Sequence, residues 1–342
     1  MSELHVDSLP RAERIRIATD MGYFPVVVTT PDGALVAVFR AGAGHMGRSG
    51  HLVASRSEDG GRTWSAPVVV ANTRQYDDRN PAVGVAKDGM ITVAYHANAM
   101  YDAKGQYMTD RRNPKAVHTG LVHSTDGGRT WGEPMLFTDH AKWDAMSPYG
   151  RILTLPDGAM AMPIYGEKSW LLWSRDGGRT WGDLTFVADD VNETAFCPLP
   201  SGEWLLLGRT SLDEERYSLL RWSSDGGRTW SAPTKFFAGR RLPSDLAVLP
   251  DGSVLAVYGY REEPYGARAR RSTDGGRTWS ETELVLHDKS RNIDCGYPSV
   301  VIHDGWAVML FYDAGATTTY DGTGAFCEAV RVPVEDLIEV LR

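Results

Sequence analysis

The sequence predicts an all-β fold, a six-bladed β-propeller of four-stranded antiparallel blades that forms a single domain over residues 1–342. The first supporting observation is a phrase ending Asp-Gly-Gly-Arg-Thr-Trp that occurs five times. The second is a set of six Asp-Gly or Ser-Gly turns, each between short β-rich runs. The tryptophans of the phrase are 67, 50, 49 and 49 residues apart, and a period near fifty indicates one supersecondary unit stacked repeatedly: Trp64, Trp131, Trp181, Trp230 and Trp279.

Each copy of the phrase is predicted to be a structural turn. Glycine adopts positive φ without steric penalty, and the preceding Asp can accept hydrogen bonds from the backbone of its own turn. The Trp can bury apolar surface against the next unit. The five acidic residues are therefore interpreted as parts of turns, and no metal site is predicted at them.

Within each unit the predicted order is strand, Asp-Gly turn, strand, loop, strand, Asp-Gly-Gly turn, strand. The first unit shows the pattern, with Val26–Val28 before its inner turn and Leu35–Phe39 after it. We expect residues 14–19 to form a strand that completes the last blade and closes the ring, and residues 334–341 to form a helix. The long insert at residues 97–117 is predicted to act as a lid over one face. The six inner turns are Asp32-Gly33, Asp88-Gly89, Asp157-Gly158, Ser201-Gly202, Asp251-Gly252 and Asp304-Gly305.

Composition excludes several classes of function. The net charge is −8 without a basic block, which argues against nucleic acid and anionic membrane surfaces as partners. No apolar run approaches the length of a membrane span and no leader is evident, so a cytoplasmic location is expected. The three cysteines, Cys197, Cys295 and Cys327, form neither a disulfide nor a metal pattern. No cofactor is predicted, and the oligomeric state is not predicted.

Counting from the inner glycines locates a polar ring near the propeller axis. Positions eight or nine residues before each glycine and seven after it fall at the same end of the antiparallel sheets. Together they are rich in Tyr, Arg, His and Glu, which predicts a polar site, and Asp78 and Arg151 lie beside them. The candidate residues from this count are Tyr23, Arg40, Asn80, His96, Tyr165, Glu193, Arg209, Tyr297 and Tyr312.

The repeated Ser-x-Asp-x-Gly-x-x-Trp phrase resembles the Asp-box of the sialidase superfamily, and the resemblance covers about residues 20–320. It implies a six-bladed propeller and a glycosidase with a tyrosine nucleophile. A neighbouring Glu, three arginines that bind the substrate carboxylate and an acid/base Asp complete the family site. The resemblance assigns the nucleophile to Tyr297, the Glu to Glu193, and two of the arginines to Arg209 and Arg268.

The sequence departs from the family pattern on the acid side. Residues 23–25 read Tyr-Phe-Pro where the family has Arg-Ile-Pro, and Asn80 stands where a second Asp is expected. Residues 41–52 contain no Asp or Glu, only the histidines His45 and His51. Because the pKa of histidine lies near neutral pH, His45 is the first choice for the general acid and His96 the second.

The leading functional hypothesis is an exo-acting, retaining glycoside hydrolase of sialidase type, with the terminal acidic sugar of a glycan as its substrate. A second hypothesis is another exo-glycosidase or a polysaccharide lyase on the same scaffold. A third is a carbohydrate-binding propeller without catalysis. Loss of one arginine and of the acid Asp favours the second and third, whereas the retained Glu, Tyr and Arg favour the first.

Overall fold

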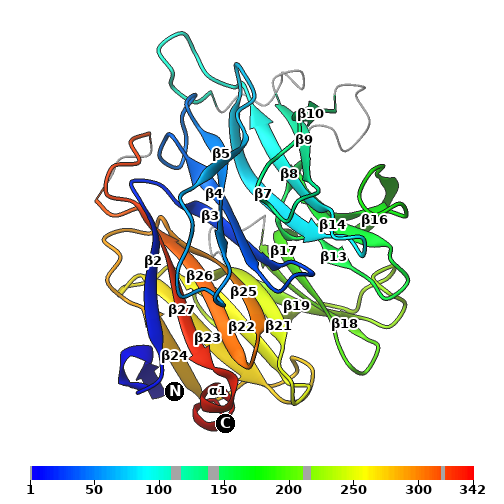
Figure 1. The fold of residues 1–342 in the computed structure, drawn as a ribbon. Coiled ribbons are helices and arrows are strands. Elements are labelled where there is room, and N and C mark those ends of the chain that lie inside the picture. The colour runs from blue at the N-terminus through cyan, green and yellow to red at the C-terminus, as the bar shows by residue number, and fades with distance from the viewer. Residues whose placement is uncertain (1, 109–116, 138–145, 211–216, 317–319) are drawn as a thin grey trace.

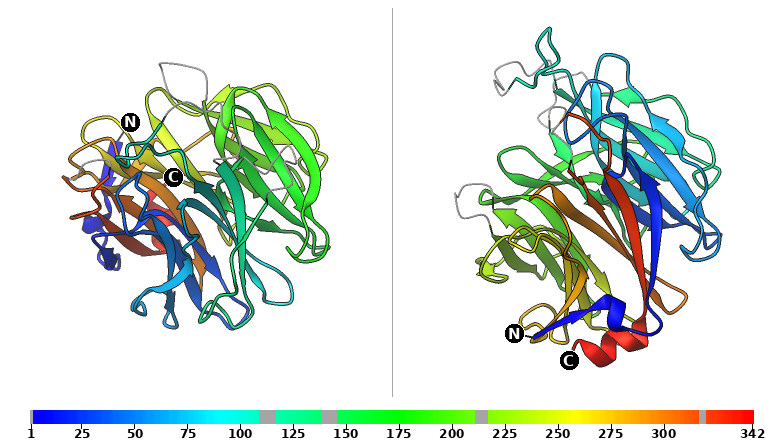
Figure 2. Two further views of the ribbon diagram at one scale, coloured as in Figure 1. Left: turned by 90° about the horizontal axis from the view of Figure 1, so that it is seen from above. Right: turned by 90° about the vertical axis from the view of Figure 1, so that its left-hand side faces the viewer.

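The computed structural model describes residues 2–108, 117–137, 146–210, 217–316 and 320–342, and its strands form six sheets around a central axis (Figures 1 and 2). This arrangement confirms the six-bladed propeller. The first three blades contain, in chain order, β3 (Tyr23–Thr29), β4 (Leu35–Ala41), β5 (His51–Ser57) and β6 (Val68–Ala71); β7 (Asp77–Val85), β8 (Ile91–Asn98), β9 (Val117–Ser124) and β10 (Met135–Leu136); and β11 (Ser147–Pro148), β13 (Leu153–Thr154), β14 (Met160–Tyr165), β15 (Ser169–Ser174) and β16 (Gly182–Ala188).

The other three blades follow the same antiparallel order. They contain β17 (Val191–Pro198), β18 (Trp204–Thr210), β19 (Ser218–Ser223) and β20 (Thr234–Lys235); β21 (Arg241–Val248), β22 (Val254–Tyr260), β23 (Gly266–Ser272) and β24 (Thr282–His287); and β25 (Cys295–His303), β26 (Trp306–Asp313), β27 (Phe326–Pro333) and β2 (Glu13–Thr19).

The two ends of the chain meet in the sixth blade. Strand β2 pairs with β27, and Figure 1 shows the two side by side, so the predicted closing strand is confirmed. The chain begins with β1 (Ser2–His5), which adds in parallel to β24, and a short 3₁₀ helix, η1 (Val6–Ser8). It ends in α1 (Val334–Val340), which confirms the predicted helix. Within the described residues, no helix is long and apolar enough to cross a membrane.

The innermost strand of the third blade is interrupted. Strands β11 and β13 both pair with β14, but the segment between them, β12 (Gly150–Arg151), leaves the blade and pairs in parallel with β7 of the second blade. Gly150 has a φ of 64°, a conformation that glycine adopts without strain. The excursion brings Arg151 to the axis, where it lines the central cavity.

Each repeated phrase forms a turn held by its own side chains. In the third copy, Ser174 Oγ donates to Asp176 Oδ1 at 2.8 Å, and the backbone N–H groups of Arg179 and Thr180 donate to the same oxygen at 3.1 and 2.9 Å. Thr180 Oγ1 donates to Asp176 Oδ2 at 2.6 Å. Since both carboxylate oxygens accept hydrogen bonds from the turn itself, the structural interpretation of the phrase is supported.

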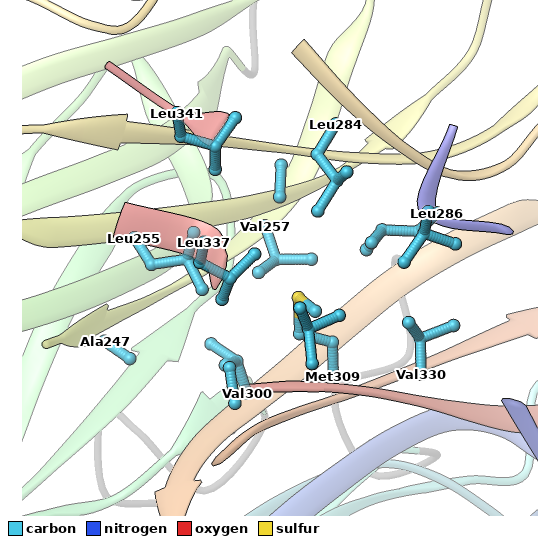
Figure 3. Close-up of a cluster of buried hydrophobic side chains, with 14 of the residues drawn as sticks. Ala247, Leu255, Val257, Leu284, Leu286, Val300, Met309, Val330, Leu337 and Leu341 are labelled. Atoms are coloured by element: carbon cyan, nitrogen blue, oxygen red, sulfur yellow. The ribbon is translucent and has the colours of Figure 1, made fainter. Parts of the chain in front are cut away.

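Six apolar clusters fill the six interfaces between neighbouring blades. On β4, Val36 and Val38 face the second blade, whereas Ala37 and Phe39 face the sixth. Alternate residues point to opposite faces of a strand, so a sheet between two neighbours needs apolar residues on both faces. Figure 3 shows the cluster between the fifth and sixth blades, where Leu337 of the C-terminal helix lies beside Leu255 and Leu341 belongs to the same cluster.

The insert in the second blade contacts loops of the first and sixth blades. The Tyr101 hydroxyl accepts from the Gly47 backbone N–H at 2.9 Å, and the Tyr107 N–H donates to the Tyr320 hydroxyl at 3.1 Å. Residues 109–116 lie outside the described residues, so the lid stays a prediction.

We predict that Trp181→Ala destabilises the fold. The Trp181 ring packs at the interface of the second and third blades and its Nε1 donates to the Gly178 carbonyl at 2.9 Å, yet the residue is only partly buried. Truncation of a fully buried Trp costs about 3–5 kcal/mol, so we expect about 2–3 kcal/mol here by chemical denaturation. Phe186→Ala, at an exposed aromatic of the same blade, is the control. Unchanged stability together with lost ligand binding would contradict the structural role.

Candidate active site

Three innermost strands begin with the same unusual backbone conformation. Phe24, Asn80 and Tyr297 have φ values of 55°, 50° and 45°, each is followed by proline, and each lies at a register irregularity of its ladder. Left-handed conformations in non-glycine residues are strained by about 1–3 kcal/mol and occur preferentially at functional sites. The shared conformation lets these three residues line one cavity on the axis.

The axial cavity receives residues from all six blades and is small, with about 20 Å³ of space open to a water molecule. Its wall is aromatic and apolar on most sides, with a few polar groups. Convergent polar side chains on an otherwise apolar wall are a feature that this cavity shares with small-molecule sites. The lining residues that bear most on its chemistry are Phe24, Asn80, Tyr149, Arg151, Asp245 and Tyr297.

A hydrogen-bonded cluster of three predicted residues lies at this cavity. The Tyr297 hydroxyl donates to Glu193 Oε1 at 2.5 Å, and Arg209 Nη1 donates to Glu193 Oε2 at 2.6 Å. The same Arg209 nitrogen is 3.4 Å from the Tyr297 hydroxyl. One carboxylate therefore binds a phenol and a guanidinium together, although the three residues come from β25, β17 and β18.

Two further predicted residues extend the cluster. The Tyr165 hydroxyl donates to Glu193 Oε1 at 3.4 Å and accepts from Asn80 Nδ2 at 3.2 Å. The structure thus brings together Asn80, Tyr165, Glu193, Arg209 and Tyr297 in one network that spans the second, third, fourth and sixth blades.

The electrostatics of the cluster fix its protonation state. Burial and the neighbouring Glu193 charge raise the pKa of Tyr297 well above its ordinary value. Burial alone would raise the pKa of Glu193, but the Arg209 charge and the hydrogen bonds from Tyr297 and Arg209 hold that pKa below its ordinary value. At neutral pH the resting site therefore contains a neutral phenol next to an ionised carboxylate.

Arg261 is a site residue that the sequence analysis missed. It follows β22, is buried, and places its guanidinium carbon 5.1 Å from the centre of the Tyr297 ring. Its charge also lowers the pKa of Glu193 and of Tyr297, although burial dominates the shift of Tyr297. The count from the inner glycine stopped at Gly259, and Arg261 lies two positions further, on the same side of the extended chain.

His45 forms a second polar pair beside the cluster. Its Nδ1 lies 2.8 Å from Asp294 Oδ1, and the Tyr312 hydroxyl donates to the same carboxylate oxygen. The His45 ring packs edge-on against Phe24 at 4.9 Å, and Phe24 packs against Tyr297 at the same distance. His45 is partly exposed, so it lies at the rim of the site with one nitrogen oriented by a carboxylate.

Two arginines predicted to contact substrate are fully buried in structural contacts. Arg40 forms an ion pair with Asp77 and donates to the carbonyls of Gly44 and Asp78 at 2.8 and 2.9 Å. Arg268 donates to the carbonyls of His287 and Pro264. The structure therefore does not bring these two guanidinium groups into the Glu193 cluster, and their contact with substrate stays a prediction.

Asp78 and Tyr23 are also buried away from the cavity. Asp78 Oδ2 accepts from the Thr73 N–H at 2.5 Å, and burial raises the pKa of Asp78 to about 7. Tyr23 is fully buried, with its ring 5.0 Å from the ring of Tyr312, which is fully buried as well. These three residues are buried, and their contact with substrate stays a prediction.

Arg151 lines the axial cavity, whereas His96 lies in the β7–β8 ladder of the second blade. Arg151 donates to Asp245 Oδ1 at 3.1 and 3.2 Å across the axis, so it forms part of the cavity wall between the third and fifth blades. His96 lies opposite Arg79 in the β7–β8 ladder and is partly buried. Neither residue contacts Tyr297 through a hydrogen bond in the described structure.

The fold and the axial cluster define a six-bladed propeller with a polar central site. A model of the BNR repeat-like domain matches residues 64–309, and the chain belongs to this family. A sialidase of Micromonospora viridifaciens is 28% identical over 123 residues, which are 34% of this chain and 19% of that protein.

Solved structures share the fold across nearly the whole chain. A crystal structure of a protein of unknown function from Dyadobacter fermentans superposes with a TM-score of 0.77 at 24% identity, covering 95% of this chain and 100% of that one. Trypanosoma rangeli sialidase in complex with sialic acid gives 0.71 at 15% identity, covering 99% of this chain and 61% of that one. A Hadza microbial sialidase gives 0.69 at 20% identity, covering 93% and 66%.

These likenesses show the fold. The chain spans 19% of the length of the curated sialidase that it matches and less than two thirds of the length of the two sialidase structures.

We predict that Arg209→Met lowers the free energy of unfolding by about 3–5 kcal/mol at neutral pH, because it leaves the Glu193 charge buried without its cationic partner. The pKa of Glu193 lies below its unfolded value in the wild type and should rise above it in the variant. The wild-type advantage is therefore fully present above the raised pKa of the variant carboxyl, and it shrinks as the pH falls from there towards the lowered pKa of the wild type.

Chemical denaturation at pH 7 and pH 4 measures this difference. Arg48→Met is the control, since Arg48 is exposed and donates only to backbone carbonyls of the described residues. An equal loss of stability at both pH values would contradict the assigned charge of Glu193.

Proposed function

We propose that the protein is an exo-acting, retaining glycoside hydrolase of sialidase type that releases a terminal sialic acid or a related acidic sugar from a glycan. The observation that carries this proposal is the 2.5 Å hydrogen bond from the Tyr297 hydroxyl to Glu193, with Arg209 on the same carboxylate. A carboxylate on the anomeric carbon of the sugar would repel a carboxylate nucleophile, whereas a neutral phenol avoids that repulsion.

In the first step, the Tyr297 oxygen attacks the anomeric carbon while its proton passes to Glu193. Because the pKa of Tyr297 is raised and that of Glu193 lowered, proton transfer is coupled to bond formation and the phenol stays protonated at rest. The bond to the leaving oxygen breaks, and His45 gives this oxygen a proton. Arg209 and Arg261 stabilise the negative charge that develops near the phenol oxygen.

In the second step, water attacks the anomeric carbon of the glycosyl-tyrosine. His45 takes a proton from the water, and the departing Tyr297 oxygen recovers its proton from Glu193. Two displacements at one carbon give overall retention of configuration. The buried position of the pair keeps other nucleophiles away from the intermediate, since both side chains are largely enclosed.

Covalent trapping tests the nucleophile. A fluorinated acidic-sugar substrate that slows the second step should add one sugar to the protein, and peptide mass spectrometry should place it on Tyr297. Tyr297→Phe, which keeps the ring that packs on Phe24, should form no adduct. An active enzyme without an adduct that gives product of inverted configuration would exclude Tyr297 as the nucleophile.

A substrate comparison tests the acid. We expect His45→Ala to reduce kcat/KM for a natural sugar linkage by about 100-fold or more, because general acid catalysis contributes about 10²–10⁴. An aryl glycoside with a good leaving group needs no protonation and should lose only a few-fold. His51→Ala, at the first residue of β5 after the same loop, is the control. Equal losses on both substrates would assign His45 a structural role.

A polysaccharide lyase acting on a uronic acid is the second candidate. It is favoured by His45, which stands in the loop where a carboxylic acid would serve a hydrolase, and by the burial of Tyr23 at the place of the first family arginine. A lyase creates an unsaturated product with new ultraviolet absorbance, which a hydrolase does not. Binding of acidic sugars without any turnover would instead support a carbohydrate-binding propeller.

A further inference from the structure

The second blade carries an arginine that neither the repeat count nor the family resemblance selected. Arg79 precedes the left-handed residue Asn80 and lies two positions before Pro81. Tyr23 holds the matching position in the first blade, two residues before Pro25 and directly before the left-handed Phe24. Arg79 is therefore the counterpart of Tyr23, displaced by one blade around the axis.

The Arg79 guanidinium has an incomplete set of partners. Its Nη1 contacts the Met46 sulfur, and its Nε is buried without a hydrogen-bond acceptor in the part of the chain that the structure describes. The nearest carboxylate charge is that of Asp77, which already pairs with Arg40 and accepts from Tyr101. The Arg79 side chain is partly exposed, and its Nε still has an unused N–H group, so this guanidinium can bind an anionic ligand.

Arg79 lies beside the cluster around Glu193, because its Nη1 contacts the sulfur of Met46, the neighbour of His45, and the residue after it, Asn80, bonds to Tyr165. The charges of Arg79 and Arg209 both act on the Tyr165 hydroxyl, which bonds to Asn80 and Glu193. Arg209 already forms an ion pair with Glu193, whereas Arg79 forms no ion pair with a carboxylate of the described residues. Two guanidinium groups thus flank Tyr165, and one of them is available to an anion.

Among the described residues of the first blade, those that line the cavity include no cationic side chain. Tyr23 is fully buried and Phe24 lines the cavity with its ring, while Arg40 is committed to Asp77 and to backbone carbonyls. An anionic group placed toward the first blade would meet aromatic rings and lose hydration without compensation.

We propose that Arg79 is a specificity-determining residue that binds the carboxylate of the acidic sugar together with Arg209, between the second and fourth blades. This assignment rests on the proposed function and deepens it, because it selects carboxylate-bearing sugars over neutral ones. A guanidinium binds a carboxylate through two parallel N–H groups, which an ammonium cannot reproduce. Lysine at position 79 should therefore fail to substitute fully.

Direct binding measurements on the full chain test the assignment. Isothermal titration with N-acetylneuraminic acid, glucuronic acid and the methyl ester of each gives Kd values for an acid and its neutral analogue. We expect Arg79→Met to raise the Kd for the acid that the wild type prefers by about 10- to 100-fold. The Kd for the ester of that acid should rise by less than about 3-fold. Arg79→Lys should fall between the two, and it keeps the test valid if Arg79→Met does not fold.

Arg48→Met supplies the matched control, since it removes one positive charge from an exposed side chain of the neighbouring loop. Three results would overturn the assignment: Arg79 variants that bind the acid as Arg48→Met does, equal losses for acid and ester, or a wild type that binds neither acid. A wild type that binds the acid through Arg79 but does not cleave glycosides would overturn the proposed hydrolysis and leave the assignment intact.

Discussion

Every sheet of this protein packs between two other sheets, so both of its faces must be apolar. The six interface clusters meet this requirement, and the pairing of β2 with β27 completes the ring that makes it possible. Polar side chains are consequently concentrated at the strand ends and on the axis. The same constraint that closes the fold thus gathers Glu193, Arg209 and Tyr297 from three distant parts of the sequence.

The protonation states of the axial cluster depend on the neighbouring charges and on the burial of its side chains. Glu193 remains ionised although it is buried, because Arg209 and Arg261 lie beside it. Tyr297 remains protonated for the complementary reason, since its anion would stand next to Glu193 in a dry environment. In the proposed reaction, the phenol proton therefore passes to Glu193 only as the phenol oxygen bonds to the substrate carbon. This arrangement explains why a phenol, a weak nucleophile in water, is suited to the proposed reaction.

The repeat pattern was sufficient to predict the fold and to select three residues that the structure brings together, whose catalytic roles stay a prediction. Glu193, Arg209 and Tyr297 stand at constant distances from turn glycines, and strand period two then fixes the end of the sheet at which they lie. Counting residues from the glycines could not show which partners each side chain binds. Arg40 has the right distance, but its ion pair with Asp77 is 37 positions away in sequence and cannot be recognised from the pattern.

The partners of Arg268 were likewise not visible in the sequence pattern. It lies on the strand face that also carries Arg270, and its guanidinium turns to the carbonyls of Pro264 and His287. Arg261, which contacts the Tyr297 ring, and Arg79, for which we propose a role in binding, each lie one or two residues outside the counted registers. Local irregularities at the starts of the innermost strands displace such residues, and they depend on tertiary packing rather than on the repeat.

The most direct test of the central claim is a crystal structure of the protein with a bound acidic sugar. The account places the sugar in the axial cavity, with its anomeric carbon next to the Tyr297 hydroxyl and its carboxylate on Arg79 and Arg209. A sugar bound outside the axial cavity, or one in the cavity with its anomeric carbon turned away from Tyr297 and Glu193, would contradict the account.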